Sequence, residues 1–265
     1  MPALETPTKV NGFEVWAPEL AHGHDGFTDQ GHDALDQVED RYFWFQCRRR
    51  LVADLLQDRI PQAGSYAEVG CGNGGVLSAV ANARPDLALT GIEASLSGLA
   101  HARRRAPQAH LLQADATRLP FTNEFDAMGV YDVIEHVDDD GAVLASMHRA
   151  LKPEGLLLVT VPQHRWLWSW VDEASCHRRR YDRAGLATRL EENGFEPLAW
   201  SSYLVWLMPM LWVSRWHKPD QPTAPRLPAP INGLLATITR AETLLTRAGW
   251  DHRWGGSLIV LARRR

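Results

Sequence analysis

Between Ser65 and Pro162, short apolar runs alternate with longer stretches in which apolar residues recur at helical spacing. The runs are Tyr66–Val69, Leu87–Ile92, His110–Gln113, Phe125–Tyr131 and Gly155–Val161. Apolar runs of this length that alternate with helices are typical of a parallel sheet covered by helices on both faces. The pattern therefore predicts an α/β, doubly wound, Rossmann-like fold.

The flanking segments extend this fold and set its limits. Residues 1–37 show little periodicity, so we expect an irregular N-terminal arm followed by one domain over residues 38–265. The proline-rich stretch 218–230 predicts an exposed extended loop. The further elements that we expect are helices over Asp40–Leu56, Ala184–Asn193 and Ile231–Ala248, and strands over Glu196–Tyr203 and Ser257–Ala262.

Composition narrows the class of protein. The chain has 265 residues, 45% of them apolar, and a formal net charge of −4, so a basic surface for nucleic acid is not expected. The three cysteines form no CxxC pair, and the N-terminus has no apolar core of signal-peptide length, so we expect a reducing cytoplasm. The longest apolar run, Tyr203–Val213, is too short to span a bilayer.

A glycine-rich turn follows the first central strand. Gly70, Gly72 and Gly75 fit the spacing GxGxxG, and Glu93 follows about 20 residues later, as in dinucleotide-binding folds. Glu68, two residues before the first glycine, argues for a different ligand, because a carboxylate repels a pyrophosphate but attracts an ammonium or sulfonium group. Both cofactor classes remain open on this motif alone.

Two further strand ends carry polar residues. Asp115 follows the third strand, at the height where an exocyclic amine of adenine would lie, and Tyr131-Asp132-Val-Ile-Glu135-His136 follows the fourth. This ordered series of motifs resembles the class I methyltransferases that use S-adenosylmethionine. The resemblance implies a seven-stranded sheet with an antiparallel last strand, and a reaction in which the acceptor displaces the activated methyl group.

The resemblance also implies roles for particular residues. The loop of Gly70 and Gly72 would pack against the methionine part of the cofactor, and Glu68 would reach its ammonium. Glu93 would hold the ribose hydroxyls. The remaining cofactor residues that we expect are Asp115 and Ala116 at the adenine, Tyr131 beside the cofactor, and Arg48 at the methionine carboxylate.

A narrower resemblance lies outside the cofactor motifs. The segments Tyr42–Arg50 and Cys176–Tyr181 look like a bacterial branch with FWF…RRR and H-x-RRY segments, whose members commonly act beside cell-envelope, sugar or natural-product pathways; here Cys176 stands where glycine is expected. We expect residues 163–183 and 204–250 to form acceptor-side or lid insertions. His164, Arg180 and Tyr181 are the predicted acceptor-binding residues, because arginine clusters suit carboxylate or phosphate groups.

The predicted reaction is O-methylation of a small molecule, such as a sugar, a lipid-linked intermediate or an aromatic natural product. An alcohol needs a proton acceptor, for which His136 and then His177 are the candidates; His136 could instead be a helix-start residue bonded to a carbonyl. N- or C-methylation remains an alternative, as do a NAD-dependent oxidoreductase, for which Glu68 is the discriminating residue, and a non-catalytic cofactor-binding protein.

Two residue groups outside these motifs permit more than one interpretation. Asp138–Asp140 invite a metal site, but three consecutive acids at a helix start fit capping better, and we expect no metal. We expect at least half of the tryptophans of the C-terminal half to be core residues. The others could line an aromatic acceptor pocket or form a patch that touches a membrane. The tryptophans concerned are Trp166, Trp168, Trp170, Trp206, Trp212 and Trp216.

Overall fold

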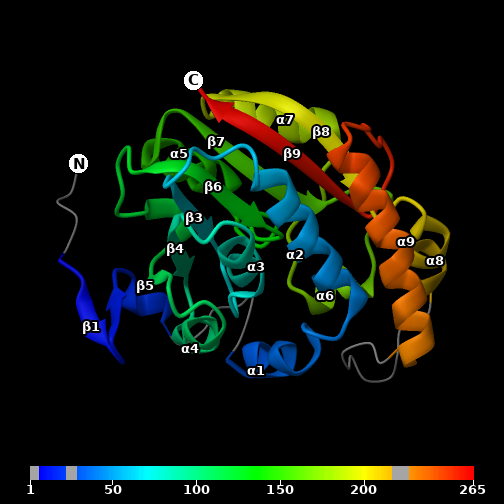
Figure 1. The fold of residues 1–265 in the computed structure, drawn as a ribbon, viewed down its shortest axis with the longest axis horizontal. Helices are drawn as coiled ribbons and strands as arrows, with labels where there is room; N and C mark the ends of the chain where they lie inside the picture. The colour runs from blue at the N-terminus through cyan, green and yellow to red at the C-terminus, as the bar shows by residue number, and fades with distance from the viewer. Residues whose placement is uncertain (1–5, 22–28, 217–226) are drawn as a thin grey trace.

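A computed structural model describes residues 6–21, 29–216 and 227–265 of the chain. Its centre is one mixed sheet in the order β1-β2-β5-β4-β3-β6-β7-β9-β8 (Figure 1). The strands are β1 (Thr8–Val10), β2 (Phe13–Val15), β3 (Ser65–Val69), β4 (Ala88–Glu93), β5 (His110–Gln113), β6 (Phe125–Tyr131), β7 (Leu151–Pro162), β8 (Phe195–Tyr203) and β9 (Ser257–Arg264). The predicted α/β class is confirmed.

The strands β5, β4, β3, β6 and β7 are parallel and carry the predicted motifs at their carboxyl ends. Glu68 of β3 is paired with Gly91 of β4 and Gly129 of β6. The last strand, β9, runs antiparallel between β7 and β8, as predicted. The strand order reverses at β3, and the ends of β3 to β6 lie at one edge of the sheet, which is where ligands bind in open α/β sheets.

The sheet has nine strands in the described part of the chain, so the prediction of seven was wrong in number. The two additional strands lie within residues 1–37, where we expected an irregular arm; β2 pairs in parallel with β5, and Phe13 and Val15 are buried. Helix α1 (Asp29–Val38) also begins in this segment. Strands of three residues are too short to produce a detectable period, and β2 is held by pairing with a distant strand. The division at residue 37 remains a prediction.

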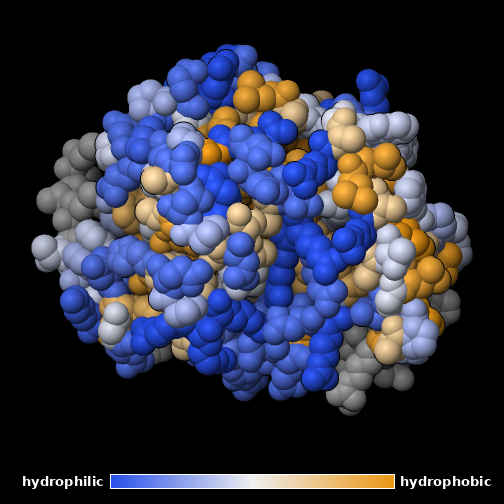
Figure 2. All heavy atoms as spheres, viewed as in Figure 1, coloured by the Kyte–Doolittle hydropathy of each residue, from blue (hydrophilic) through white to orange (hydrophobic). Residues whose placement is uncertain are grey.

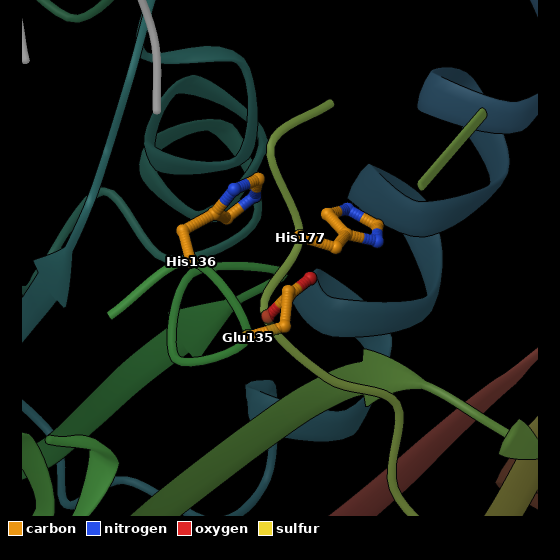
Figure 3. A group of neighbouring side chains, drawn as sticks. All are labelled: Glu135, His136 and His177. Atoms are coloured by element: carbon orange, nitrogen blue, oxygen red, sulfur yellow. The ribbon is translucent and has the colours of Figure 1, made fainter. Parts of the chain in front are cut away.

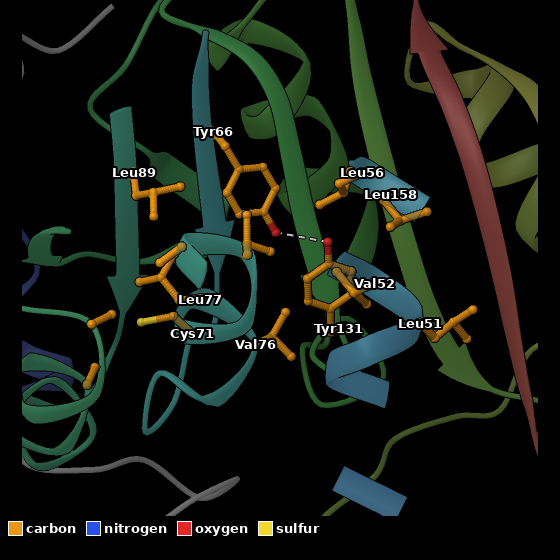
Figure 4. Close-up of a cluster of buried hydrophobic side chains, with 14 of the residues drawn as sticks. Leu51, Val52, Leu56, Tyr66, Cys71, Val76, Leu77, Leu89, Tyr131 and Leu158 are labelled. Carbon is orange, nitrogen blue, oxygen red and sulfur yellow. Dashed lines mark hydrogen bonds between the residues drawn. The ribbon is translucent and has the colours of Figure 1, made fainter. Parts of the chain in front are cut away.

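Helices cover both faces of the sheet and bury two hydrophobic clusters. Side chains alternate across a sheet, so adjacent strand residues belong to different clusters. Tyr66 lies in the cluster with residues of α2, α3 and α4 (Figure 4), and Ala67 lies in the cluster with residues of α5 and α7. The helices are α2 (Phe43–Leu56), α3 (Gly75–Ala83), α4 (Leu96–Arg105), α5 (Asp140–Ala150), α6 (Trp170–Ala174), α7 (Arg183–Glu192), α8 (Met208–Ser214) and α9 (Ala229–Arg247).

The tryptophans of the C-terminal half are largely exposed, so the expectation that at least half are core residues was wrong. Five of the six have exposed side chains, and Trp170 is half-buried. Hydrophobic side chains gather over α8 and α9 at the right of Figure 2. No helix in the described ranges is both long and apolar enough to cross a membrane. Residues 218–226 of the predicted proline-rich loop lie outside the described part of the chain.

Candidate active site

A cavity of about 710 Å³ lies at the carboxyl ends of β3, β4, β5 and β6. The helices α1 and α2 also contribute to its wall, through residues such as Leu35 and Trp44. The structure brings together all eight predicted cofactor residues and both predicted catalytic histidines on this wall. They are Arg48, Glu68, Gly70, Gly72, Glu93, Asp115, Ala116, Tyr131, His136 and His177.

The glycine loop needs its glycines for conformation and for space. Gly70 has a φ of 68°, in the left-handed region that favours glycine. A Cβ atom at Gly70 would lie 2.4 Å from Cγ2 of Val133. The amides of Gly70 and Cys71 both donate to the carbonyl of Ile92, at 2.8 and 3.0 Å. The loop is thereby tied to the end of β4 and forms the floor of the cavity.

Two acids at neighbouring strand ends are held by backbone amides. The carboxylate of Glu93 accepts hydrogen bonds from the amides of Gly72, Ala94 and Ser95, at 2.8, 2.9 and 3.1 Å. That of Asp115 accepts from the amide of Thr117 at 2.9 Å and caps the short helical turn Ala116–Arg118. These bonds fix both carboxylates at the cavity wall, where they can accept hydrogen bonds from hydroxyls and an amine.

The carboxyl group of Glu68 is buried at the floor of the cavity, and its Oε2 atom has no hydrogen-bond partner among the described residues. Burial raises the pKa of Glu68 to about 8, although Arg48 opposes the shift. The guanidinium of Arg48 pairs with Asp132 at 2.6 Å. An orphaned buried carboxyl fits a cationic ligand group, as the predicted contact with an ammonium requires.

We expect S-adenosylmethionine binding at pH 6.5 to release about one proton per chain, because Glu68 is protonated without ligand and an ammonium beside it favours the ionised form. Titration calorimetry in buffers of different ionisation enthalpy measures the release. The variant Glu68→Gln should bind with no release from this site. Equal proton release by Glu68→Gln and the natural chain would contradict the assignment.

A second group of polar side chains comes from the loops after β6 and α6, and two of them, His136 and His177, line the cavity. Glu135, His136 and His177 lie close together, with the two imidazole centroids 4.8 Å apart (Figure 3). Nδ1 of His177 is 2.9 Å from Oδ1 of Asp172. Glu135 is fully buried, which raises its pKa well above the usual range, and neither carboxyl oxygen has a hydrogen-bond partner among the described residues.

The three predicted acceptor-binding residues lie outside the lining of this cavity. The Arg180 guanidinium is buried and bonded to Asp172, and the Tyr181 hydroxyl donates to Asp140 at 2.8 Å. His164 stacks on Trp166, with centroids 5.4 Å apart. The polar atoms of Arg180 and Tyr181 are hydrogen-bonded to buried carboxylates. These bonds depend on how the chain packs, which the spacing of residues in the sequence does not show.

Two further predictions are refined by the structure. Tyr131 lines the cavity, but its hydroxyl lies in the core, 2.9 Å from the hydroxyl of Tyr66 (Figure 4). Of the acids at 138–140, Asp139 caps α5 by accepting from the amide of Ala142, and Asp140 is buried. Capping by these acids is confirmed at Asp139.

Sequence reasoning missed several lining residues. His32, Leu35 and Glu39 come from α1 and its end, mostly inside the segment predicted to be irregular. Asp132 was recognised only as part of a motif, and its partnership with Arg48 joins residues 84 positions apart. Glu135 lies in the same motif as Asp132, and this was the only sequence signal for it. That its carboxyl group is buried without a hydrogen-bond partner among the described residues is visible only in the structure.

Comparisons with known proteins agree with this geometry. Residues 67–159 match the family described as "Methyltransferase domain". The chain is 33% identical over 112 residues to a dTDP-3-amino-3,4,6-trideoxy-alpha-D-glucopyranose N,N-dimethyltransferase of Streptomyces venezuelae, over 41% of this chain and 46% of the relative. It is 29% identical over 171 residues to a probable S-adenosylmethionine-dependent methyltransferase of Mycolicibacterium smegmatis, over 63% of this chain and 64% of the relative. The chain thus spans about half to two thirds of these relatives.

Among solved structures, the fold is similar to phosphoethanolamine N-methyltransferase 2 of Haemonchus contortus in complex with S-adenosyl-L-methionine. The TM-score is 0.58 at 18% identity, over 91% of this chain and 58% of the other. Residues 67–159 therefore correspond to a methyltransferase domain, and a longer part of the chain is similar to a probable S-adenosylmethionine-dependent methyltransferase. These similarities support the predicted methyltransferase class and S-adenosylmethionine as the cofactor.

Proposed function

We propose that the whole chain transfers a methyl group from S-adenosylmethionine to an oxygen of a small-molecule acceptor, such as a sugar, a lipid-linked intermediate or an aromatic natural product. When bound, the cofactor supplies a methyl group activated by a sulfonium. Glu68 would hold its ammonium, Glu93 its ribose hydroxyls, and Asp115 with the backbone of Ala116 its adenine. The catalytic contribution of the protein is mainly the positioning of the two reactants.

The observation that carries oxygen transfer is the pair of imidazoles on the cavity wall. His136 and His177 both line the cavity that Glu68, Glu93 and Asp115 line. An alcohol or phenol must lose its proton during transfer, and histidines at the acceptor's position can orient the hydroxyl and assist that loss. Transfer to nitrogen is the alternative, supported by the N,N-dimethyltransferase activity of the S. venezuelae relative.

The surroundings of the cavity support an acceptor with an anionic group. A second hollow of about 520 Å³ is lined by arginines and Trp168, and Arg178 lines both this hollow and the main cavity. Arginine binds carboxylate and phosphate through two parallel hydrogen bonds. The arginines of the hollow are Arg165, Arg178, Arg179 and Arg180, of which the last three also pair with the carboxylates of Asp138, Asp140 and Asp172.

We further propose that the protein acts from the cytoplasm and that the exposed tryptophans of α8 and its neighbours touch a membrane surface. Trp206, Trp212 and Trp216 are exposed in and beside α8, together with Met210 and Val213. Amphipathic aromatic rings favour the interface between water and lipid. This placement would suit an acceptor attached to a lipid.

The proposal is tested first by calorimetric titration with S-adenosylmethionine, S-adenosylhomocysteine and NAD in parallel. We expect the two sulfur compounds to bind and NAD to remain silent. A screen for methyl transfer to hydroxylated acceptors, with amino analogues of the same acceptors, then identifies the methylated atom. Binding of NAD alone would reject the proposal, and cofactor binding without turnover on any acceptor would favour a non-catalytic protein.

Glu93→Ala should weaken S-adenosylmethionine binding by about 1.5–3 kcal/mol, because it removes a charged acceptor from two hydroxyls. The control variant Glu93→Gln keeps the shape and one acceptor oxygen, so its loss should be smaller. Affinity is measured by calorimetry, and the far-ultraviolet circular dichroism of each variant shows whether it is folded. Unchanged affinity in a folded Glu93→Ala protein would remove Glu93 from the ribose site.

A further inference from the structure

We propose that Glu135, His136 and His177 form a binding site for one first-row divalent transition-metal cation, Zn²⁺ or Mn²⁺, at the acceptor side of the cavity. Each side chain offers one ligand atom, and these atoms lie within 4.8 Å of one another (Figure 3). Bonds of about 2.0–2.2 Å to a common ion place ligand atoms roughly 3–4 Å apart. Small side-chain rotations close the remaining gap.

The carboxyl group of Glu135 is the observation that points to a ligand. It is fully buried, and both of its oxygens lack a hydrogen-bond partner among the described residues. A buried carboxyl without a partner costs several kcal/mol, so such groups are ordinarily paired or bound to a metal. The arginines that influence it, Arg48 and Arg180, are each bonded to another carboxylate. A cation at the three side chains would satisfy Glu135.

The position of His177 is already fixed in the way that metal-binding histidines require. Its Nδ1 atom is 2.9 Å from Asp172, and Arg180 holds that carboxylate through contacts of 2.6 and 3.1 Å. A histidine that donates Nδ1–H to a carboxylate presents its Nε2 lone pair to a metal. The backbone carbonyl of Glu135 also accepts from the amide of Arg178 at 2.7 Å, which ties the loop of His177 to the loop of Glu135.

The donor set indicates the kind of cation. Two imidazoles and one carboxylate suit Zn²⁺, Mn²⁺ and related ions, whereas Mg²⁺ and Ca²⁺ prefer oxygen ligands throughout. Three protein ligands leave coordination positions open, as in catalytic metal sites. Since His136 and His177 line the cavity, these open positions can face the acceptor.

The role of this metal site in catalysis rests on the proposed function, which is methyl transfer to an oxygen. A hydroxyl coordinated to a divalent cation has a much lower pKa and loses its proton to water at neutral pH. His136 and His177 would then act by holding the ion that binds the acceptor oxygen. The inference also favours acceptors with a hydroxyl, and especially those with two adjacent oxygens that can share one ion.

The test is a metal titration of the purified full chain after treatment with a chelator and desalting, with neither cofactor nor acceptor present. Zn²⁺ and Mn²⁺ are followed by calorimetry, Mg²⁺ serves as the comparison, and Co²⁺ reports its coordination through visible absorption. We expect one ion per chain, with Zn²⁺ bound at least about 100-fold more tightly than Mg²⁺. A natural chain that binds no transition-metal ion overturns the inference, whatever its activity.

The variants Glu135→Gln and His177→Asn should each lower Zn²⁺ affinity by at least about 100-fold. The variant His110→Asn is the matched control, because His110 is an exposed histidine away from the proposed site. Its affinity for Zn²⁺ should not change. Thermal melting and S-adenosylmethionine affinity show that the variants fold. Binding of Zn²⁺ that survives both substitutions in folded protein also overturns the site. Because the titration needs no acceptor, failure of methyl transfer and failure of metal binding are separate results.

Discussion

Replacing Arg180 by methionine is expected to lower the free energy of unfolding by about 3–5 kcal/mol. The guanidinium of Arg180 and the carboxylate of Asp172 are both buried, and they meet through contacts of 2.6 and 3.1 Å. A third bond goes from Arg180 to the carbonyl of Gln163 at 2.9 Å. Burial opposes ionisation of Asp172, yet hydrogen bonds from His177 and Arg180 lower its pKa to about 2. Removing the arginine leaves a buried charge without its main partner.

Urea denaturation of Arg180→Met measures this loss, with Arg183→Met as the matched control. Arg183 pairs with Asp251 at 2.5 Å, but both side chains are about one third to one half exposed, at 30% and 44%. A solvent-exposed pair contributes at most about 1 kcal/mol. If Arg180→Met were as stable as the control but lost affinity for the acceptor, Arg180 would be the acceptor-binding residue that the sequence predicts.

Replacing Gly70 by alanine is expected to destabilise the fold by about 2–5 kcal/mol and to abolish cofactor binding. The backbone φ of 68° costs a residue with a Cβ atom about 1–2 kcal/mol. The added Cβ would lie 2.4 Å from the side chain of Val133, and overpacking of this kind costs about 1–3 kcal/mol more. The loop cannot yield easily, because its amides are bonded to the end of β4.

Gly72→Ala separates the two causes, since Gly72 also has a positive φ, 52°, but a Cβ there would meet nothing within 4 Å. Its expected cost is about 1–2 kcal/mol, from the backbone alone. The double variant Gly70→Ala/Val133→Ala should recover part of the stability lost by Gly70→Ala. Denaturant midpoints measure all three proteins, and equal losses at Gly70 and Gly72 would show that the contact with Val133 has no effect.

The glycine loop and the environment of Arg180 differ in how far the sequence reveals them. The glycine loop is local: its residues are adjacent in the chain, and their spacing after an apolar strand is enough to identify Gly70 and Gly72. The environment of Arg180 depends on burial, which spacing does not report. Its arginine run is typical of a solvated or anion-binding turn, whereas a buried carboxylate eight residues away takes up its side chain.

The same distinction applies to the errors in the fold. The central parallel strands have long apolar runs that need no partner to be recognised, and the antiparallel last strand was implied by the family resemblance. β1, β2 and α1 form in a segment with weak periodicity because β2 pairs with β5 and α1 packs against α4. The C-terminal tryptophans looked like core residues by type alone, but the sheet is already covered by α2, α3, α4, α5 and α7.

By itself, the sequence determined the α/β class, the motifs at the strand ends and ten of the residues that line the cavity, because parallel strands carry their functional residues at adjacent carboxyl ends. Only the tertiary structure decided which polar groups have partners. It pairs Arg48 with Asp132 and Arg180 with Asp172. It also places the buried carboxyl group of Glu135 beside two histidines. Pairing depends on distance in space and on burial, and for these groups both follow from how separate segments pack together.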